Sequence, residues 1–187
     1  MPTREVPDIA APVKVSLDPA TTAILVLDMS DALCGRNPLC VATVPTVRGL
    51  LDRARAAGAR VIYTLGRAPQ NVLPELDRRP GDPVVATSAD KYFQTELEAH
   101  LRGIATPILV GGNSNGAVLY TAFAASARGL SVIVAEDAIS SKDEWGTWVA
   151  RWQMLNQPGF TNAENKPLAP KAVTLTRTDL IDFARKG

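Results

Sequence analysis

Residues 22–29, with the sequence TAILVLDM, form a continuous apolar run that ends at the acidic residue Asp28 and at Met29. A short run without polar alternation is typical of a strand that is buried on both faces, as in a parallel sheet. In such sheets the site lies at the carboxyl ends of the strands. The run therefore predicts a buried strand and makes Asp28 a candidate site residue, although an acid here would also suit a cap for the next turn.

Helical and strand-like patterns alternate along the rest of the chain. Apolar residues recur at helical spacing from Val47 to Ala54, which predicts a helix that begins near Pro45 and closes at Gly58. Further strands are expected at residues 60–65, 84–87, 107–111, 131–135 and 172–175, and further helices at about 93–101, 117–128, 145–155 and 179–185. This alternation predicts an α/β fold, a mostly parallel open sheet with helices on both faces in three layers.

The length of 187 residues suits one domain. The first 20 residues are rich in proline and show no clear period, so we expect an extended N-terminal arm over residues 1–20 and one domain over residues 21–187. The N-terminus lacks the apolar core of a signal peptide, and no apolar run reaches the ~20 residues of a membrane-spanning helix. We therefore expect a cytoplasmic protein without a membrane partner.

Charge and residue counts argue against several kinds of function. The 20 Lys and Arg residues nearly balance the 19 Asp and Glu residues, so there is no basic excess for nucleic-acid binding. One His and two Cys cannot build a four-ligand Cys/His zinc site, and we expect neither a metal nor a cofactor. His100, which a Ser-His-Asp triad would need, is expected to be structural. Cys34 and Cys40 are expected to be reduced, although their spacing also permits a disulfide.

A glycine-rich turn and a lysine are further candidates. The segment 111–117, GGNSNGA, joins a predicted strand to a predicted helix. The N–H groups of residues 115–117 would then suit a carboxylate or a developing oxyanion, whereas the simpler interpretation is a plain turn. Lys91 could pair with Asp28 or hold an anionic substrate, although a loop lysine taken alone is most often solvated.

Aromatic residues are expected to line a small pocket. Tyr92, Phe93 and Tyr120 are the candidates, together with one tryptophan. Trp145, Trp148 and Trp152 fall on one face of a predicted helix. This stripe is expected to pack against the core or a partner subunit, and a wall that stacks on the substrate is the alternative.

Several segments, taken in order, resemble one enzyme family. They are Ala23–Met29, Leu50–Val61, Thr95–Leu97, Ile108–Val110 with the turn into Ala117–Ala122, and Gly129–Val134 with Asp137–Ser140. Their order and spacing resemble the isochorismatase-like hydrolases, also called the cysteine hydrolases, over most of residues 20–140. The resemblance implies a hydrolase domain with a mostly parallel, Rossmann-like sheet, a small-molecule substrate and a homodimer or homotetramer.

Hydrolases of this family use an Asp, a Lys and a Cys. The resemblance implies that Asp28 is the aspartate and that Ala117 occupies the position of the nucleophilic cysteine. The family lysine falls near Ala86, five residues before Lys91, and the family's metal-binding histidines have no match. The resemblance thus implies a member that lacks the nucleophilic Cys, whether Ala117 is native or engineered.

The resemblance also assigns roles around the glycine-rich turn. It implies a cis peptide bond between Gly112 and Asn113, and oxyanion donors at Gly116 and Ala117. The residues expected to bind the substrate or an oxyanion are Asn113, Ser114, Asn115, Gly116, Tyr92 and Tyr120.

Three functional hypotheses follow. The first is a hydrolase that uses acid–base catalysis at Asp28 without a covalent thiol intermediate. Its substrate would be a small molecule, which could be anionic. Isochorismatases proper also lack the cysteine. The second is an amide or hydrazide hydrolase whose nucleophile was changed to Ala117 or relocated to Cys34. The third is a non-catalytic homologue that binds a ligand or serves as an assembly subunit.

Overall fold

A six-stranded sheet forms the centre of the computed structural model, which describes residues 6–184. Its strands follow the order β4-β3-β2-β5-β6-β7, and neighbouring strands are parallel throughout. The strands are β2 (Thr22–Leu27), β3 (Arg60–Leu65), β4 (Val84–Ala86), β5 (Thr106–Gly111), β6 (Val132–Ile139) and β7 (Val173–Thr176). This arrangement confirms the predicted α/β fold with a mostly parallel sheet.

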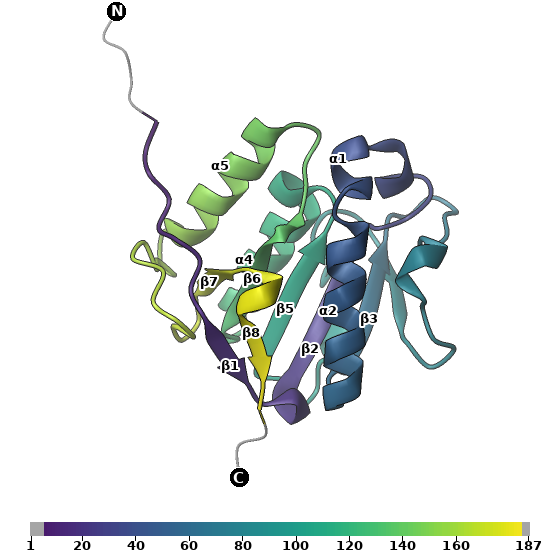
Figure 1. Cartoon of the computed structure of the whole chain (residues 1–187), viewed down its shortest axis with the longest axis horizontal. Coiled ribbons are helices and arrows are strands. Elements are labelled where there is room, and N and C mark those ends of the chain that lie inside the picture. Colours follow the sequence, from purple (N-terminus) through teal and green to yellow (C-terminus); the bar gives the residue numbers. More distant parts are fainter. Residues whose placement is uncertain (1–5, 185–187) are drawn as a thin grey trace, which may run out of the picture.

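Helices cover both faces of the sheet (Figure 1). They are α1 (Pro38–Val41), α2 (Val44–Ala57), α3 (Leu97–His100), α4 (Leu119–Ala127) and α5 (Glu144–Leu155), and a π-helical turn (Ser114–Val118) leads into α4. Alternate residues of β2 point to opposite faces, because side chains alternate along a strand. Ile24 and Val26 therefore pack in the core under α2, whereas Leu25 and Leu27 pack in the core under α3, α4 and α5. The sheet is thus buried on both sides.

Helix α2 follows the sequence pattern closely. Val47, Leu50, Leu51 and Ala54 are all buried on its inner face. Gly58 ends the helix in a left-handed conformation, and its N–H donates to the carbonyl of Ala54. The predicted helix near residues 45–58 is confirmed.

A glycine is required where β2 and β5 come together at their carboxyl ends. Gly111 is paired with Leu27, and its φ is +125°. A Cβ at Gly111 would lie 2.1 Å from the carbonyl oxygen of Leu27. A side chain would therefore push apart the two strands that present Asp28 and the glycine-rich turn.

The helix expected over residues 93–101 is mostly absent. Only α3 forms, because Gln94 adopts a left-handed φ of 56° that interrupts a helix. Phe93, expected to start the helix, is exposed, while Leu97 and Leu101 are buried. The spacing thus identified two of the three inward positions correctly, and it failed at Phe93, where the backbone is not helical.

The closing helix expected from residue 179 is also wrong over the described residues. A 3-10 turn (Thr178–Leu180) leads into strand β8 (Ile181–Phe183). This strand pairs in parallel with β1 (Val15–Leu17), which lies in the segment expected to be an extended arm. Thr178 donates from its N–H and hydroxyl to the carboxylate of Asp137. A partner that is distant in sequence therefore overrides the local helical pattern.

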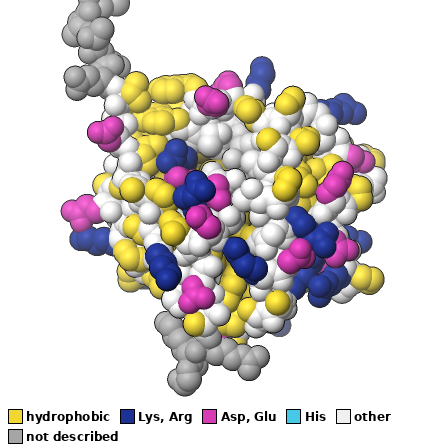
Figure 2. Space-filling model, viewed as in Figure 1, with side chains coloured by type: hydrophobic (Ala, Val, Ile, Leu, Met, Phe, Trp, Pro, Cys, Tyr) yellow, Lys and Arg dark blue, Asp and Glu magenta, His cyan; other side chains and the backbone are white. Residues whose placement is uncertain are grey.

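The surface carries charges of both signs. On the face with α2, Figure 2 shows basic and acidic side chains intermixed. Within residues 6–184, no helix is long and apolar enough to cross a membrane.

Candidate active site

Asp28 lies at the carboxyl end of β2, where the chain turns away from the sheet. Its backbone has a φ of 54°, and its N–H donates to the carbonyl of Thr64 at 3.0 Å. This hydrogen bond ties the residue to the end of β3. Asp28 as a whole is 4% exposed, so its carboxyl group lies in a largely dry setting.

Lys91 lies in the segment after β4 and contacts Asp28 at the end of β2. Its Nζ lies 2.7 Å from Oδ1 of Asp28 and 3.3 Å from the carbonyl oxygen of Leu65. Lys91 is 1% exposed, and Thr95 donates from its hydroxyl to the Lys91 carbonyl. The structure thus brings together the two charged residues singled out in the sequence, and Lys91 is not a solvated loop lysine.

Burial and Lys91 act in opposite directions on the pKa of Asp28. Burial raises the pKa of the Asp28 carboxyl above its ordinary value, while the positive charge and hydrogen bond of Lys91 lower it in part. Oδ1 is held by Lys91, but Oδ2 accepts no hydrogen bond from the described residues. One carboxylate oxygen is therefore fixed and the other is free for a substrate.

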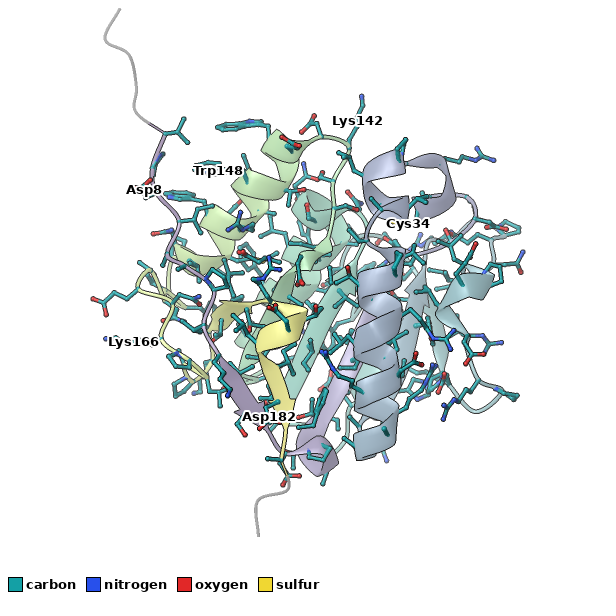
Figure 3. The ribbon with its side chains drawn as sticks, in the orientation of Figure 1. Asp8, Cys34, Lys142, Trp148, Lys166 and Asp182 are labelled. Carbon is teal, nitrogen blue, oxygen red and sulfur yellow. A yellow bond between two sulfur atoms is a disulfide. The ribbon has the colours of Figure 1, made fainter. Side chains whose placement is uncertain are left out.

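A cavity of about 450 Å³ opens in front of Asp28. Its wall combines Asp28, the turn at Gly112 and Asn113, the segment after β6 at Ser141 and Lys142, and the segment Leu33–Pro38 with Cys40. The elements thus converge at the carboxyl ends of the strands, and Figure 3 shows Cys34 and Lys142 at this end of the molecule. The volume suits a small organic molecule.

The charged groups around the cavity are unevenly distributed. Arg36 and Lys142 are exposed at its wall, and Asp28 is the one acidic residue among the described residues that line it. Because Lys91 neutralises Asp28, the wall carries an excess of positive charge. An anionic ligand would therefore be attracted to it.

The glycine-rich turn forms the opposite wall. Asn113 has a left-handed φ of 60°, and no cis peptide bond occurs in residues 6–184. The expected cis bond between Gly112 and Asn113 is therefore wrong, because the left-handed Asn113 makes the turn with trans bonds. A Cβ at Gly112 would lie 3.2 Å from the sulfur of Cys40, so the turn packs closely against that cysteine.

One of the two expected oxyanion donors, the N–H of Gly116, already has a partner within the protein. The N–H of Gly116 donates to the carbonyl of Asn113 at 2.9 Å. The Asn113 side chain also folds over Gly116, since a Cβ there would lie 2.6 Å from Nδ2 of Asn113. Ala117 is fully buried and does not line the cavity. Among residues 113–117 of the turn, Asn113 alone lines the cavity.

Ser114 and Asn115 instead connect the turn to α5 and the segment before it. The hydroxyl of Ser114 lies 3.3 Å from that of Thr147, and Ser141 donates from its hydroxyl to Oδ1 of Asn115 at 2.6 Å. Gly146 allows this close contact, because a Cβ there would lie 2.6 Å from the Ser141 hydroxyl. The two residues support the site rather than line it.

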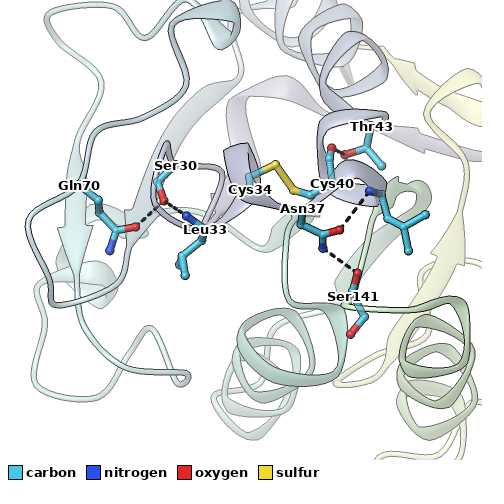
Figure 4. Close-up of a disulfide and its surroundings, with 9 residues drawn as sticks. Ser30, Leu33, Cys34, Asn37, Cys40, Thr43, Gln70 and Ser141 are labelled. Atoms are coloured by element: carbon cyan, nitrogen blue, oxygen red, sulfur yellow. Dashed lines mark hydrogen bonds between the residues drawn. A yellow bond between two sulfur atoms is a disulfide. The ribbon is translucent and has the colours of Figure 1, made fainter.

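Cys34 and Cys40 form a disulfide (Figure 4). The expectation that both are reduced is therefore wrong, and these are the chain's only cysteines. Folding brings them together because the 3-10 turn (Cys34–Arg36) and α1 double back on each other. In this form Cys34 has no thiolate, which contradicts its proposed role as a relocated nucleophile.

The aromatic residues expected in the pocket lie elsewhere. Tyr92 is buried in the core beneath the guanidinium of Arg128, which lies 4.3 Å from its ring centre, and burial raises its pKa. Phe93 and Tyr120 are exposed. None of these three lines the cavity, because it opens between loops at the strand ends rather than beside α4.

The tryptophans form a separate feature on α5. Trp145 and Trp148 stack with ring centres 4.9 Å apart and line a second cavity of about 590 Å³. Trp145 is exposed rather than packed in the core.

The sequence interpretation missed Asn37 and Ser141. The side chain of Asn37 caps α1 by accepting from the N–H of Leu39, and it donates to the carbonyl of Ser141 at 2.8 Å. An Asn followed by Pro is a helix-start signal, and Ser141 follows a predicted strand end. Both signals were present, but neither specified that the segments meet.

No group of three or more His, Cys, Asp or Glu side chains in the described chain could hold a metal ion. The buried acid–lysine pair lies at the carboxyl ends of a parallel sheet, and together they define an α/β protein with an enzyme-like site. Residues 22–164 match the isochorismatase domain, and the chain therefore belongs to the isochorismatase family. This membership supports its assignment as a hydrolase. No match among curated proteins was found.

Solved structures of related fold agree with the family assignment. An isochorismatase-like hydrolase from Alkaliphilus metalliredigens superposes with a TM-score of 0.73 at 19% identity, over 86% of this chain and 96% of that one. A cysteine hydrolase from Pseudomonas syringae pv. phaseolicola 1448A gives 0.75 at 20% identity, over 90% and 94%. N-carbamoylsarcosine amidase from Thermoplasma acidophilum gives 0.69 at 23% identity, over 85% and 97%. At these identities the similarity establishes the fold.

Proposed function

We propose that this chain hydrolyses a small anionic molecule by acid–base catalysis at Asp28, without a covalent thiol intermediate. One observation carries the proposal: Asp28 faces the cavity with one oxygen held by the buried Lys91 and the other unengaged. Arg36 and Lys142 at the cavity wall support an anionic substrate.

Each residue has a distinct part in this mechanism. Asp28 transfers a proton to or from the substrate through Oδ2. Lys91 is a positioning residue, since it holds Oδ1 and lies behind the carboxyl group rather than in the cavity wall. Because burial raises the pKa of Asp28, the carboxyl group is better matched to proton transfer near neutral pH than a solvated aspartate.

The absence of thiol chemistry has two supports. The family's cysteine position is assigned by resemblance to Ala117, which has no nucleophilic atom, and both cysteines of the chain are paired in the disulfide. Asp28 is thus the reactive group that remains at the cavity. Three expectations stay predictions: the assembly as a homodimer or homotetramer, the cytoplasmic location, and the domain boundary between residues 20 and 21.

The test is Asp28→Asn, assayed on a substrate found by screening small carboxylates that carry ether, ester or amide bonds. We expect a fall in kcat of about 10²–10⁴-fold, the usual contribution of a general acid or base. Asp31→Asn is the matched control, because Asp31 is exposed three residues away and binds Asn71 instead. Full turnover by Asp28→Asn would show that the assignment is wrong.

The pH profile gives the direction of proton transfer. If Asp28 is the base, kcat/KM rises as the pH rises through its pKa, which lies above the ordinary value of 3.8; if it is the acid, kcat/KM falls over the same range. A wild-type profile that shows no change in kcat/KM above pH 3.8 would contradict both roles. Asp31→Asn should give the same profile as wild type.

A further inference from the structure

Residues 34–40, here called the disulfide loop, form one wall of the cavity in front of Asp28. Both cysteines line this cavity, and Arg36, Asn37 and Pro38 line it between them. The disulfide takes no part in the chemistry proposed at Asp28, but it belongs to the same cavity. A change at this bond therefore acts directly on the space that a substrate would occupy.

The disulfide loop has few polar attachments to the rest of the protein. Its 3-10 turn and α1 have three and four residues, and helices this short are not stable by themselves. Four of the five residues between the cysteines are exposed. Within the described residues, one hydrogen bond joins the loop to a segment distant in sequence, from Nδ2 of Asn37 to the carbonyl of Ser141 at 2.8 Å (Figure 4). The disulfide is therefore the main constraint on the shape of the loop.

Arg36 is the charged residue of the disulfide loop. Its side chain is exposed at the cavity wall, two residues after Cys34. A disulfide removes many of the conformations that an open segment of the same length adopts. The bond thus keeps Arg36 at the wall, whereas an open segment lets the guanidinium move away. Lys142, the other cation at this wall, lies outside the loop, so breaking the bond affects one of the two cations.

We propose that the Cys34–Cys40 disulfide is a redox switch for substrate affinity at this cavity. In the oxidised form the loop holds Arg36 where it binds the anionic group of the substrate, and in the reduced form the loop loosens and the affinity falls. The inference rests on the anionic substrate proposed above. Asp28 is positioned by β2 and Lys91 rather than by the loop, so the proton-transfer step should be nearly unaffected.

The switching step needs a dithiol as the reductant. One of its thiolates attacks a sulfur of the disulfide, and its second thiol resolves the mixed disulfide that results. The S–S bond of the protein breaks to give two cysteine thiols while the dithiol becomes a disulfide, so two electrons and two protons pass to the protein. Each cysteine is at most 2% exposed, so the reaction takes place when the loop opens locally.

Trypsin cleavage tests the loop without any substrate. Oxidised wild type is compared with Cys34→Ala/Cys40→Ala, which removes the bond without adding buried hydroxyl groups. Cleavage after Arg36 is measured against cleavage after Arg78, an exposed residue in the segment before β4 and outside the cavity wall. We expect cleavage after Arg36 to rise at least about tenfold in the variant, because proteolysis follows the population of the open loop, with cleavage after Arg78 unchanged.

Two results of this digestion would overturn the proposal. Equal acceleration at Arg36 and Arg78 would show general unfolding rather than a local change. No acceleration at Arg36 would show that the disulfide does not hold the loop.

The kinetic experiment uses the substrate found in the screen. Reduction of wild type with dithiothreitol should raise KM about tenfold, the contribution of one charge-assisted contact. The same treatment should change kcat by less than about twofold, because the acid–lysine pair stays in place. A disulfide that survives dithiothreitol in the native chain, or a KM that is equal in both redox forms, would overturn the proposal.

Matched variants connect the effect to the bond and to Arg36. Cys34→Ala/Cys40→Ala should show the KM of the reduced form with or without dithiothreitol. Arg36→Gln should have a raised KM that reduction no longer changes; a KM that reduction still raises tenfold in this variant would overturn the role of Arg36. Failure of the proposed function is distinguishable, because full turnover by Asp28→Asn would refute the acid–base assignment without altering the trypsin result.

Discussion

Replacement of Lys91 by methionine should destabilise the fold strongly, although the two side chains are similar in length. The change removes the ammonium group that lies 2.7 Å from Oδ1 of Asp28, while Asp28 stays 4% exposed. A buried charge that loses its partner typically costs about 3–5 kcal/mol. Methionine fills the space of the lysine stem, so this loss reports the missing charge rather than a cavity.

The loss should depend on pH in a defined direction. Burial raises the pKa of Asp28 above 3.8, and Lys91 counteracts this in part, so the pKa rises further in Lys91→Met. A carboxyl group whose pKa is raised by folding contributes stability that is complete below its unfolded pKa and is lost as the pH rises through its folded pKa. The variant should therefore come closest to wild type near pH 3.8, and the difference should grow toward neutral pH.

Urea unfolding at several pH values measures both effects. Lys142→Met is the control, because Lys142 is an exposed lysine at the wall of the same cavity, and its replacement should change the unfolding free energy by less than about 0.5 kcal/mol. Asp28→Asn combined with Lys91→Met should recover part of the loss, since no ionised carboxylate is left buried. A loss below about 1 kcal/mol that is independent of pH would refute the reasoning.

Two glycine substitutions test the fold, and reduction tests the disulfide. Gly111→Ala and Gly49→Ala should change the free energy of unfolding in opposite directions, as measured by thermal unfolding. Gly111→Ala should lower it by more than about 1 kcal/mol, because the added Cβ would meet Leu27, whereas Gly49→Ala, at an open position within α2, should raise it by about 0.5–1 kcal/mol. A stabilising Gly111→Ala would contradict the close approach of β2 and β5. Reduction of the Cys34–Cys40 disulfide should cost about 2 kcal/mol for so short a loop, measured by urea unfolding with and without reductant. Alkylation followed by mass spectrometry should label neither cysteine before reduction, and two labelled thiols in the native chain would contradict the pairing.

The repeating apolar patterns were sufficient to predict the sheet and its main helix. The run before Asp28 is buried on both faces, and the stripe from Val47 to Ala54 faces the core. Burial of apolar area dominates folding energetics, so patterns of this kind carry over directly into structure. Patterns weakened by competing contacts failed, as at Gln94 and at the segment that forms β8 instead of a helix.

The candidate site was predicted unevenly. Asp28 and Lys91 were identified as charged residues near strand ends, and Asn113 was identified from its turn. The aromatic residues Tyr92 and Tyr120 were wrong as cavity residues, because whether a side chain points inward or outward after a turn depends on backbone angles that the sequence pattern does not specify.

The sequence by itself determined the layered α/β class and the position of Asp28 at a strand end, because both follow from local order along the chain. The tertiary structure decided which groups meet: Lys91 with Asp28 across 63 residues, and Cys34 with Cys40. Such contacts depend on how the segments cross the sheet, and pairing between distant charges leaves no periodic trace in the sequence. The chemistry of this chain therefore lies in contacts that only folding creates.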